Sequence, residues 1–388
     1  MNKKIVGIII FVVLIAIIIG VKYVVPMFNG EGEPENDIGN LVITDEAELE
    51  GLTKVTVATG GGKEGFIGDK RVISIMQKRY GLNVIYDSWS NGKLIVNPLV
   101  REDGSKYDLM FCSDQRFYDY YRLAPDKTKG EADRYNVQEG GLILNTPIVI
   151  YSWDAVVDAL IQENIVTLED GTYYITDMNK LLQYILEGKK WTDIGLDIYA
   201  PINISSTDPV TSSPGATYYG LLLSIMCDGF VTEEKMEENL PKLKEFYEKS
   251  GYMNNTPADL FDSYLKLGMG AKPMIVDYEK SMVEFAIKNP DGYAQVKDHI
   301  RVLYPKPTIW NSHCIASFDE AGNKYYEAFN DKEIQQIAWD SYGFRTGVAA
   351  GNYDVSSVGI PGIPQNITST VTSLKMSMYN RLIEYLGE

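Results

Sequence analysis

A short polar stretch holds the side chains of this chain that are best suited to binding a small ligand. It reads STDPVTSSP over Ser206–Pro214, and an apolar run, GATYYGLLLSIM, follows directly. The run predicts a helix over Pro214–Cys227, with Ser213 as the N-cap and Pro214 at the first helical position, where its missing N–H costs nothing. The polar residues are therefore expected at the start of a helix.

Capping explains only part of this composition, because one cap needs a single hydroxyl. Four further polar residues are left over: Thr207, Asp208, Thr211 and Ser212. A helix start carries unpaired N–H groups and partial positive charge, so it can hold an anion or a polar oxygen. On its own, the stretch fits either a ligand cradle or an ordinary capped loop.

The residues upstream predict a succession of strand, helix and strand. KVTVATG (Lys54–Gly60) alternates like a strand. A helix capped by Asp69 follows, with its apolar residues on one face: Val72, Ile73, Met76 and Tyr80. Two further strands are LNVIYDS and YDLMFCSD, a spacing that predicts βαβ units and a parallel sheet. Later helices are predicted over residues 179–187, 233–249 and 257–267 and near the C-terminus.

Several polar loops fall where predicted strands end. In the first half of the chain they are Gly60–Lys63, Ser88–Asn91 and Ser113–Asp114. In the second half they are STDPVTSSP and DYEKS, residues 277–281. Open α/β sheets bind ligands at the ends of their strands. Two sets of such loops, far apart in sequence, predict two lobes with a cleft between them.

Composition and charge narrow the functional class. The chain has 388 residues, enough for two lobes with full cores, and a formal net charge of −17 without a Lys/Arg cluster, which argues against nucleic-acid binding. Its three cysteines form no CxxC and its two histidines no HExxH, so we expect no metal and no cofactor. Cys112 and Cys227 lie in apolar runs and are expected to be buried.

The N-terminus predicts a membrane anchor. Lys3 and Lys4 precede a stretch without charge from Ile5 to Val21, and continuing through Val25 it reaches about the 20 residues that cross a bilayer. We expect residues 1–26 to be an uncleaved signal anchor in the cell membrane, with the bulk of the chain extracellular or periplasmic. A cleaved signal peptide is the alternative. The Gly-, Pro- and acid-rich residues 27–51 are expected to be a linker.

Four sequence blocks carry a resemblance to a known family. They are STDPVTSSPGATYYGLLL, TPIVIYSWDAVVDAL, GAKPMIVDYEKSMVEF and the long block that begins YPKPTIWNSHCIASFDEAG. Together they resemble the type II extracellular (periplasmic-type) solute-binding proteins of ABC transporters, over about residues 52–347. The resemblance implies an α/β fold of two lobes joined by two crossing strands, near Ile143–Tyr151 and Val302–Trp310. Lobe 1 would be 52–144 with 311–388, and lobe 2 would be 145–310.

The same resemblance implies which residues line the cleft. The wall of lobe 1 would be formed by Lys63, Ser90 and Ser113, and Gly61 and Gly62 would let the backbone approach the ligand closely. The wall of lobe 2 would be formed by Thr207, Ser212 and Ser213. Tyr278, in DYEKS, matches a tyrosine that reaches the ligand in molybdate-type relatives.

Two acidic residues bear on the charge of the ligand. Asp114 and Asp208 stand beside the hydroxyl-rich loops, and a carboxylate next to a bound anion is unfavourable unless it faces away or pairs with a cation such as Lys63. The surrounding hydroxyl and amide donors favour an anion. A cationic or zwitterionic ligand would use the two carboxylates instead.

The resemblance implies a monomeric binding protein that captures a small polar solute by hinge closure and delivers it to an ABC transporter permease. The anchor leaves a second class open, a surface sensor or assembly protein with the same fold. A surface hydrolase is the third class. Its single support is Asp277 with Glu279, which would share a face of a strand at positions i and i+2. With no GxSxG motif, we expect the chain not to be an enzyme.

Overall fold

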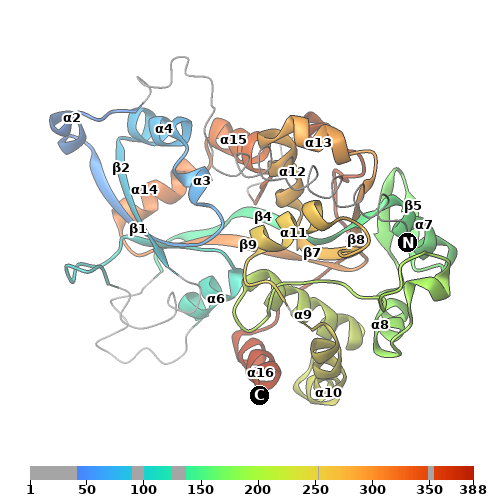
Figure 1. Cartoon of the computed structure of the whole chain (residues 1–388). Helices are drawn as coiled ribbons and strands as arrows, with labels where there is room; N and C mark the ends of the chain where they lie inside the picture. The colour runs from blue at the N-terminus through green and yellow to red at the C-terminus, as the bar shows by residue number, and fades with distance from the viewer. Residues whose placement is uncertain (1–41, 90–99, 124–136, 252, 348–353) are drawn as a thin grey trace, which may run out of the picture. The chain divides into compact units, whose positions relative to one another are not determined.

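The elements of the chain are built from short apolar runs separated by polar turns. They are seen in a computed structural model that describes residues 42–89, 100–123, 137–251, 253–347 and 354–388. These elements lie in one unit, Thr44–Glu388 (Figure 1). No helix in these ranges is long and apolar enough to cross a membrane. The predicted anchor, residues 1–26, lies outside the described residues and stays a prediction.

The last residues of the predicted linker, 27–51, form a short helix, and the linker itself stays a prediction because residues 27–41 lie outside the described ranges. Helix α2 (Glu46–Glu50) begins after Asp45, whose Oδ1 accepts hydrogen bonds from the backbone N–H of Ala47 at 3.0 Å and of Glu48 at 3.2 Å. An aspartate N-cap followed by glutamates in the first turn favours a helix start electrostatically. The acid-rich composition therefore reflects a capped helix at this end.

The first section of the sheet confirms the expected βαβ unit. Strand β1 (Thr53–Gly60) pairs in parallel with β2 (Leu82–Trp89) and β3 (Leu109–Cys112). Helices α3 (Glu64–Ile67) and α4 (Lys70–Tyr80) connect β1 to β2. Asp69 caps α4 as predicted, accepting from the N–H of Arg71 at 2.8 Å. Helix α6 (Gln115–Leu123) follows β3.

One long strand runs through both sections of the sheet. The first half of β4 (Gly140–Trp153) pairs antiparallel with β9 (Thr308–Ser317), from Gly140 to Pro147. Its second half pairs antiparallel with β7 (Met274–Tyr278) and β8 (Ile300–Pro305). The strand order of the main path is β2-β1-β3-β9-β4-β8-β6-β5 (Figure 1). The crossing predicted near Ile143–Tyr151 corresponds to β4.

The second section is dominated by helices around β7 and β8. A hairpin of β5 (Val166–Glu169) and β6 (Thr172–Ile175) extends it through β8. The helices before β7 are α7 (Asp154–Gln162), α8 (Met178–Leu186), η4 (Trp191–Ile194), α9 (Ser213–Met226), α10 (Glu233–Lys249) and α11 (Pro257–Leu267). Those between β7 and β8 are α12 (Glu279–Lys288) and α13 (Pro290–Val296). The predicted helices 179–187, 233–249 and 257–267 correspond to α8, α10 and α11.

The C-terminal elements return to the first section and then leave it. Their order is α14 (Glu320–Ala328), α15 (Lys332–Tyr342), β10 (Arg345–Thr346), η5 (Val355–Val358), β11 (Thr370–Val371) and α16 (Met376–Gly387). The apolar side chains of Leu382 and Leu386 in α16 pack into the core that contains α9 and α10. This packing differs from the expected grouping of all residues 311–388 with lobe 1. The lobe boundaries stay a prediction.

The apolar residues form separate cores on the two sections. One cluster joins α3, α4, β1 and α15 around Phe66 and Phe329. Another surrounds Trp191 and the apolar face of α9. The cysteines described by the structure are Cys112, Cys227 and Cys314. All three are buried and form no disulfide bond, and their burial confirms the expectation for the first two. Burial of this apolar surface is the main contribution to stability in each section.

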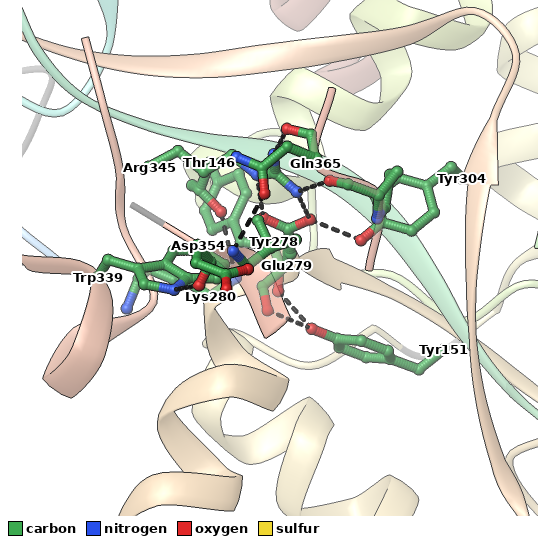
Figure 2. A network of polar contacts seen from close by, with 12 residues as sticks. Thr146, Tyr151, Tyr278, Glu279, Lys280, Tyr304, Trp339, Arg345, Asp354 and Gln365 are labelled. Atoms are coloured by element: carbon green, nitrogen blue, oxygen red, sulfur yellow. Dashed lines mark hydrogen bonds and ion pairs between the residues drawn. The ribbon is translucent and has the colours of Figure 1, made fainter. Parts of the chain in front are cut away.

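A buried ion pair ties the C-terminal segment to the second section. The Glu279 carboxylate, at the start of α12, accepts from Arg345 Nε at 2.6 Å and Nη2 at 2.8 Å, and both side chains are at most 3% exposed. Tyr304 donates to the same carboxylate at 2.5 Å, and Arg345 also donates to the carbonyl oxygens of Pro364 and Gln365 (Figure 2). The pair is fully hydrogen-bonded, as a buried pair must be to persist.

We predict that Glu279→Gln lowers the free energy of unfolding by about 3–5 kcal/mol, because it leaves the buried Arg345 charge uncompensated. The matched control is Glu237→Gln, which breaks the ion pair of Glu237 with Arg381, where the side chains are 54% and 37% exposed. That change should cost at most about 1 kcal/mol. Urea unfolding followed by circular dichroism measures both. Equal losses in the two variants would contradict the structural role of Glu279.

Candidate ligand-binding site

The loop after β1 presents glycine backbone above a buried lysine. Gly61 and Gly62 are exposed, and Gly62 has a φ of +84°, a conformation that favours glycine. A Cβ at Gly62 would meet nothing within 4 Å, so this backbone borders open space. Lys63, the next residue, is 1% exposed and turns its ammonium inward. The predicted glycines are therefore accessible, whereas the predicted lysine lies beneath them.

Lys63 holds this loop to the end of β3. Its Nζ donates to the carbonyl oxygen of Gly60 at 2.7 Å and to Ser113 Oγ at 2.8 Å, and Ser113 Oγ donates to the Gly61 carbonyl oxygen at 2.6 Å. The ammonium also lies 4.8 Å from the centre of the Phe111 ring. Burial lowers the pKa of Lys63 to about 7. The structure thus brings together Lys63, Ser113 and the glycine loop, as the sequence predicts.

Asp114 is paired with a cation that the sequence interpretation missed. Its Oδ1 accepts from the backbone N–H of Arg116 at 2.8 Å and from Arg116 Nε at 2.9 Å, and Oδ2 contacts Nη2. Both side chains are nearly buried, at 5% and 7% exposure. The Tyr379 ring of α16 covers the guanidinium, with its centre 3.7 Å from Cζ. Arg116 therefore neutralises Asp114, a role for which the sequence suggested a cation such as Lys63.

The start of α9 lies one residue earlier than predicted. Ser213 is the first helical residue and Ser212 is the N-cap, so Pro214 is the second helical residue. Ser212 is extended, with φ −127° and ψ 129°, and its side chain makes no capping hydrogen bond. Its carbonyl oxygen accepts from the N–H of Ala216 at 2.9 Å, which starts the helical hydrogen-bond pattern. The expectation that Ser213 caps the helix is wrong by one position.

The loop before α9 rests directly on its first turn. A Cβ at Gly215 would lie 2.2 Å from the carbonyl oxygen of Thr207, so glycine is required for this contact. Thr207 is 1% exposed. Asp208 Oδ1 accepts from the N–H of Val210 at 2.9 Å, and the Asp208 carbonyl oxygen accepts from the N–H of Ser212 at 2.8 Å. Asp208 thus faces its own turn, one of the two conditions under which it tolerates an anion.

Tyr278 connects the second section to Asp114. It ends β7, and its backbone is fixed by Asp277 Oδ1, which accepts from its N–H at 2.7 Å, and by Tyr151 Oη, which donates to its carbonyl oxygen at 2.5 Å. Burial raises the pKa of Tyr278, and the nearby Asp114 carboxylate raises it further, while Arg116 lowers it. The Asp114 and Arg116 side chains, which follow β3, therefore lie within electrostatic range of Tyr278 at the end of β7.

Three buried hydroxyl groups around this meeting point lack a well-placed protein partner. They belong to Thr207, Thr217 and Tyr278, and none makes a hydrogen bond of good geometry to the described residues. Thr217 lies in the first turns of α9, and its hydroxyl is close enough to Tyr278 to lower the pKa of that phenol. Buried polar groups normally have a partner, so these hydroxyl groups are candidates for contact with a bound solute.

The predicted site is therefore assembled in part. One wall is formed by Gly61, Gly62, Lys63 and Ser113. Asp114 lies near Tyr278 and Thr217. Thr207 and Ser212 lie at the start of α9. Ser90 lies outside the described residues. Sequence reasoning missed three residues: Arg116, Thr217 and Tyr379. Thr217 follows Ser213 by one helical turn, a spacing that could have placed it on the same face. No sequence signal links Tyr379 to Arg116.

The carboxylate pair suggested for a hydrolase is not a pair. Strand β7 ends at Tyr278 and Glu279 begins α12, so Asp277 and Glu279 do not share a strand face. Glu279 binds Arg345, whereas Asp277 binds the N–H of Tyr278 and has a pKa raised by burial to about 7. Within the described ranges, no three or more His, Cys, Asp and Glu side chains gather as they would around a metal ion.

Comparison with known proteins identifies the fold. No family model and no curated protein matches the chain. Among solved structures, it is similar to the ferric binding protein from Campylobacter jejuni, with a TM-score of 0.55 and 14% identity over 86% of this chain and 97% of that one. It is also similar to the substrate binding protein of the ABC transporter from Agrobacterium tumefaciens, with a TM-score of 0.52 and 16% identity over 88% and 96% of the two chains.

A third similar structure is the Trichodesmium protein in complex with iron and citrate, with a TM-score of 0.52 and 14% identity over 86% of this chain and 97% of that one. At these identities the likeness shows the fold alone. The chain has the mixed α/β fold, with one large sheet, of these solved binding proteins. This confirms the α/β fold that the resemblance implies.

We predict that Gly215→Ala lowers the free energy of unfolding by about 1–3 kcal/mol, because its Cβ would overlap the carbonyl oxygen of Thr207. Gly220→Ala is the matched control in the same helix, since its Cβ would meet Leu374 no closer than 3.6 Å. The control should be neutral or stabilising by about 1 kcal/mol, as alanine favours a helix interior. Thermal unfolding of both variants measures these two changes in stability. A stable Gly215→Ala protein would show that the Thr207 loop is not seated on α9.

Proposed function

We propose that this protein captures a small anionic solute between two lobes outside the cell and delivers it to an ABC-type transporter. The observation that carries the proposal is the set of buried hydroxyl groups of Thr207, Thr217 and Tyr278, which make no hydrogen bond of good geometry to the described residues, beside the neutralised Asp114. Hydroxyl groups can donate to the oxygens of an anion. The fold supports binding rather than catalysis as the role of these groups.

The charge balance of the site favours an anion. Two carboxylates could repel a bound anion. Asp114 pairs with Arg116, and Asp208 accepts a hydrogen bond from a backbone N–H of its own turn. The ammonium of Lys63, next to the glycine loop, also lacks a carboxylate partner among the described residues. A cationic solute would find Asp114 already paired with Arg116, whereas Asp208 is hydrogen-bonded without a cation among the described residues. Backbone N–H groups at a helix start add further donors, as in other anion sites.

Hinge closure follows from the strand arrangement. Strand β4 belongs to both sections of the sheet, and the chain returns between them from β8 to β9. We propose these two crossings as the hinge between the lobes. A solute that contacts both Tyr278 and the loop Gly60–Lys63 would favour the closed state through its higher affinity for that state. The solute would then stabilise the protein and reduce its radius of gyration.

The cellular setting completes the proposal. Residues 1–26 would anchor a monomer to the membrane, with the remaining chain extracellular or periplasmic, near a transporter permease. A surface sensor or assembly protein that keeps the binding fold is the alternative function, favoured by an uncleaved anchor. Two neighbours are described as a ferric binding protein and a complex with iron and citrate, so ferric citrate belongs in the ligand screen.

We predict that Tyr278→Phe weakens binding of the captured anion by about tenfold or more while leaving stability unchanged, since its hydroxyl has no well-placed protein partner. Thermal shift of the full chain in detergent against sulfate, molybdate, phosphate, ferric citrate, sugars and amino acids identifies the ligand. Calorimetric titration then compares the variants. A bound solute should raise the melting temperature of the wild type.

Tyr304→Phe is the matched control, because its hydroxyl donates to Glu279 at 2.5 Å. It should lower stability by about 1.5–3 kcal/mol without changing affinity. No response to any solute in the screen would refute the capture function. Ligand binding without uptake loss in a strain carrying Tyr278→Phe would favour the sensor or assembly role over delivery.

A further inference from the structure

The ammonium of Lys63 is a buried charge without a carboxylate partner. Its two printed hydrogen bonds go to neutral acceptors, the Gly60 carbonyl oxygen and Ser113 Oγ. No ion pair among the described residues includes it, in contrast to Arg116 and Arg345. A buried charge is normally paired, because its removal from water is costly. The ammonium of Lys63 therefore lacks a compensating negative charge among the ion pairs of the described residues.

The groups around Lys63 do not supply the missing charge. The neighbouring ionisable groups are Glu64 on α3, the thiols of Cys112 and Cys314 on β3 and β9, His313 on β9 and Lys280 on α12. Glu64 and the thiols favour the ammonium, but burial outweighs them and Lys280 opposes it, so the pKa of Lys63 falls to about 7. Lys280 has its own partner, Glu284, at 3.2 Å.

His313 adds a donor rather than a negative charge. Burial and the two lysines hold its pKa well below the usual value, so the ring is neutral. Its Nε2 lies 3.1 Å from Asn311 Nδ2, which can only donate, so the proton is assigned to Nδ1. That Nδ1 is buried without a partner. His313 and Lys280 thus add a donor and a positive charge near Lys63, whereas Glu64 and the two thiols oppose them without forming an ion pair with it.

We infer that Lys63 is the residue that selects an anionic solute at the Gly61–Gly62 loop, and that binding of this solute takes up one proton at Lys63 Nζ. The inference rests on the proposed capture function and deepens it. Ser113 joins the ammonium to the exposed loop, because it accepts from Nζ and donates to the Gly61 carbonyl oxygen. The anion would lie above the loop and act on the charge directly beneath it.

The physical consequence is a linkage between affinity and pH. In the free protein Lys63 exchanges its proton near pH 7, and an anion nearby stabilises the charged form. The bound state therefore holds more protons than the free state above about pH 7. Affinity should be constant at low pH and fall by up to about tenfold per pH unit above it. The proton comes from solvent, and no covalent bond is made or broken.

The test uses sulfate and molybdate, which keep their charge between about pH 6 and pH 8. Calorimetric titration of the full chain at both pH values, in two buffers of different ionisation enthalpy, measures affinity and proton uptake. We expect about tenfold weaker binding at about pH 8 and uptake of up to about one proton. Lys63→Arg should bind at both pH values without uptake, since arginine stays charged. Lys63→Met should bind weakly at both.

Lys272→Met is the control for a general loss of positive charge, because Lys272 lies elsewhere, with Nζ 3.3 Å from Ser205 Oγ. It should keep the wild-type pH dependence. If the Lys63 variants fail to fold, Asp277→Asn tests the other group with a pKa near 7, and it should leave the proton uptake unchanged. Binding of an anion without proton uptake would overturn the inference and leave the capture function intact. Binding of a sugar or amino acid in place of any anion would overturn it as well, and no binding at all would refute the capture function.

Discussion

The hydrogen bonds of β4 are the constraint on which the rest of the structure depends. This strand pairs with β9 through its first half and with β7 and β8 through its second half. Its register fixes Ile148 opposite Tyr278, and β9 fixes Cys314 opposite Cys112 at the end of β3. The strand ends that carry Asp114 and Tyr278 are thereby brought together, although 163 positions separate them in sequence. A shift of one residue in β4 would turn every side chain to the other face.

Within that framework, pairing decides what each buried charge can do. Glu279 and Arg345 satisfy one another and several backbone groups, so they serve the fold. Asp114 and Arg116 form an ion pair near Tyr278, so the pair adds no net charge to the proposed site. Lys63 is the exception, since its acceptors are neutral. Of these three buried cations, two form structural pairs and Lys63 does not, which is why we propose Lys63 as the charge that acts on a solute.

Local sequence signals predicted the elements well. The Asp69 cap and the helices α8, α10 and α11 follow from capping and periodicity, which act within a few residues. The β5–β6 hairpin was missed although its signal is present: Asp170 and Gly171 both have positive φ, at 48° and 83°, as a two-residue hairpin turn requires. The first turn of α9 was placed one residue late because both Ser212 and Ser213 suit a cap.

Site residues were predicted where they belong to a strand-end loop and missed where only tertiary packing places them. Gly61, Lys63 and Ser113 are neighbours because β1 and β3 are paired, a relation that the βαβ pattern contains. Arg116 meets Tyr379 because α16 packs across from α9 and α10, and no local pattern encodes that contact. The charge around the predicted site depends on such contacts. Sequence could name the carboxylates but could not tell which cation compensates them.

The two tyrosines at the centre of the molecule show how stability and binding are divided among similar side chains. Tyr304 and Tyr278 are both buried, but Tyr304 donates to a carboxylate and Tyr278 makes no well-placed hydrogen bond to the described residues. An unmade hydrogen bond inside a protein costs free energy in the absence of a partner. In the proposed capture function, a solute that supplies acceptors to Tyr278, Thr217 and Thr207 would offset this cost. These groups would then add affinity that does not depend on net charge.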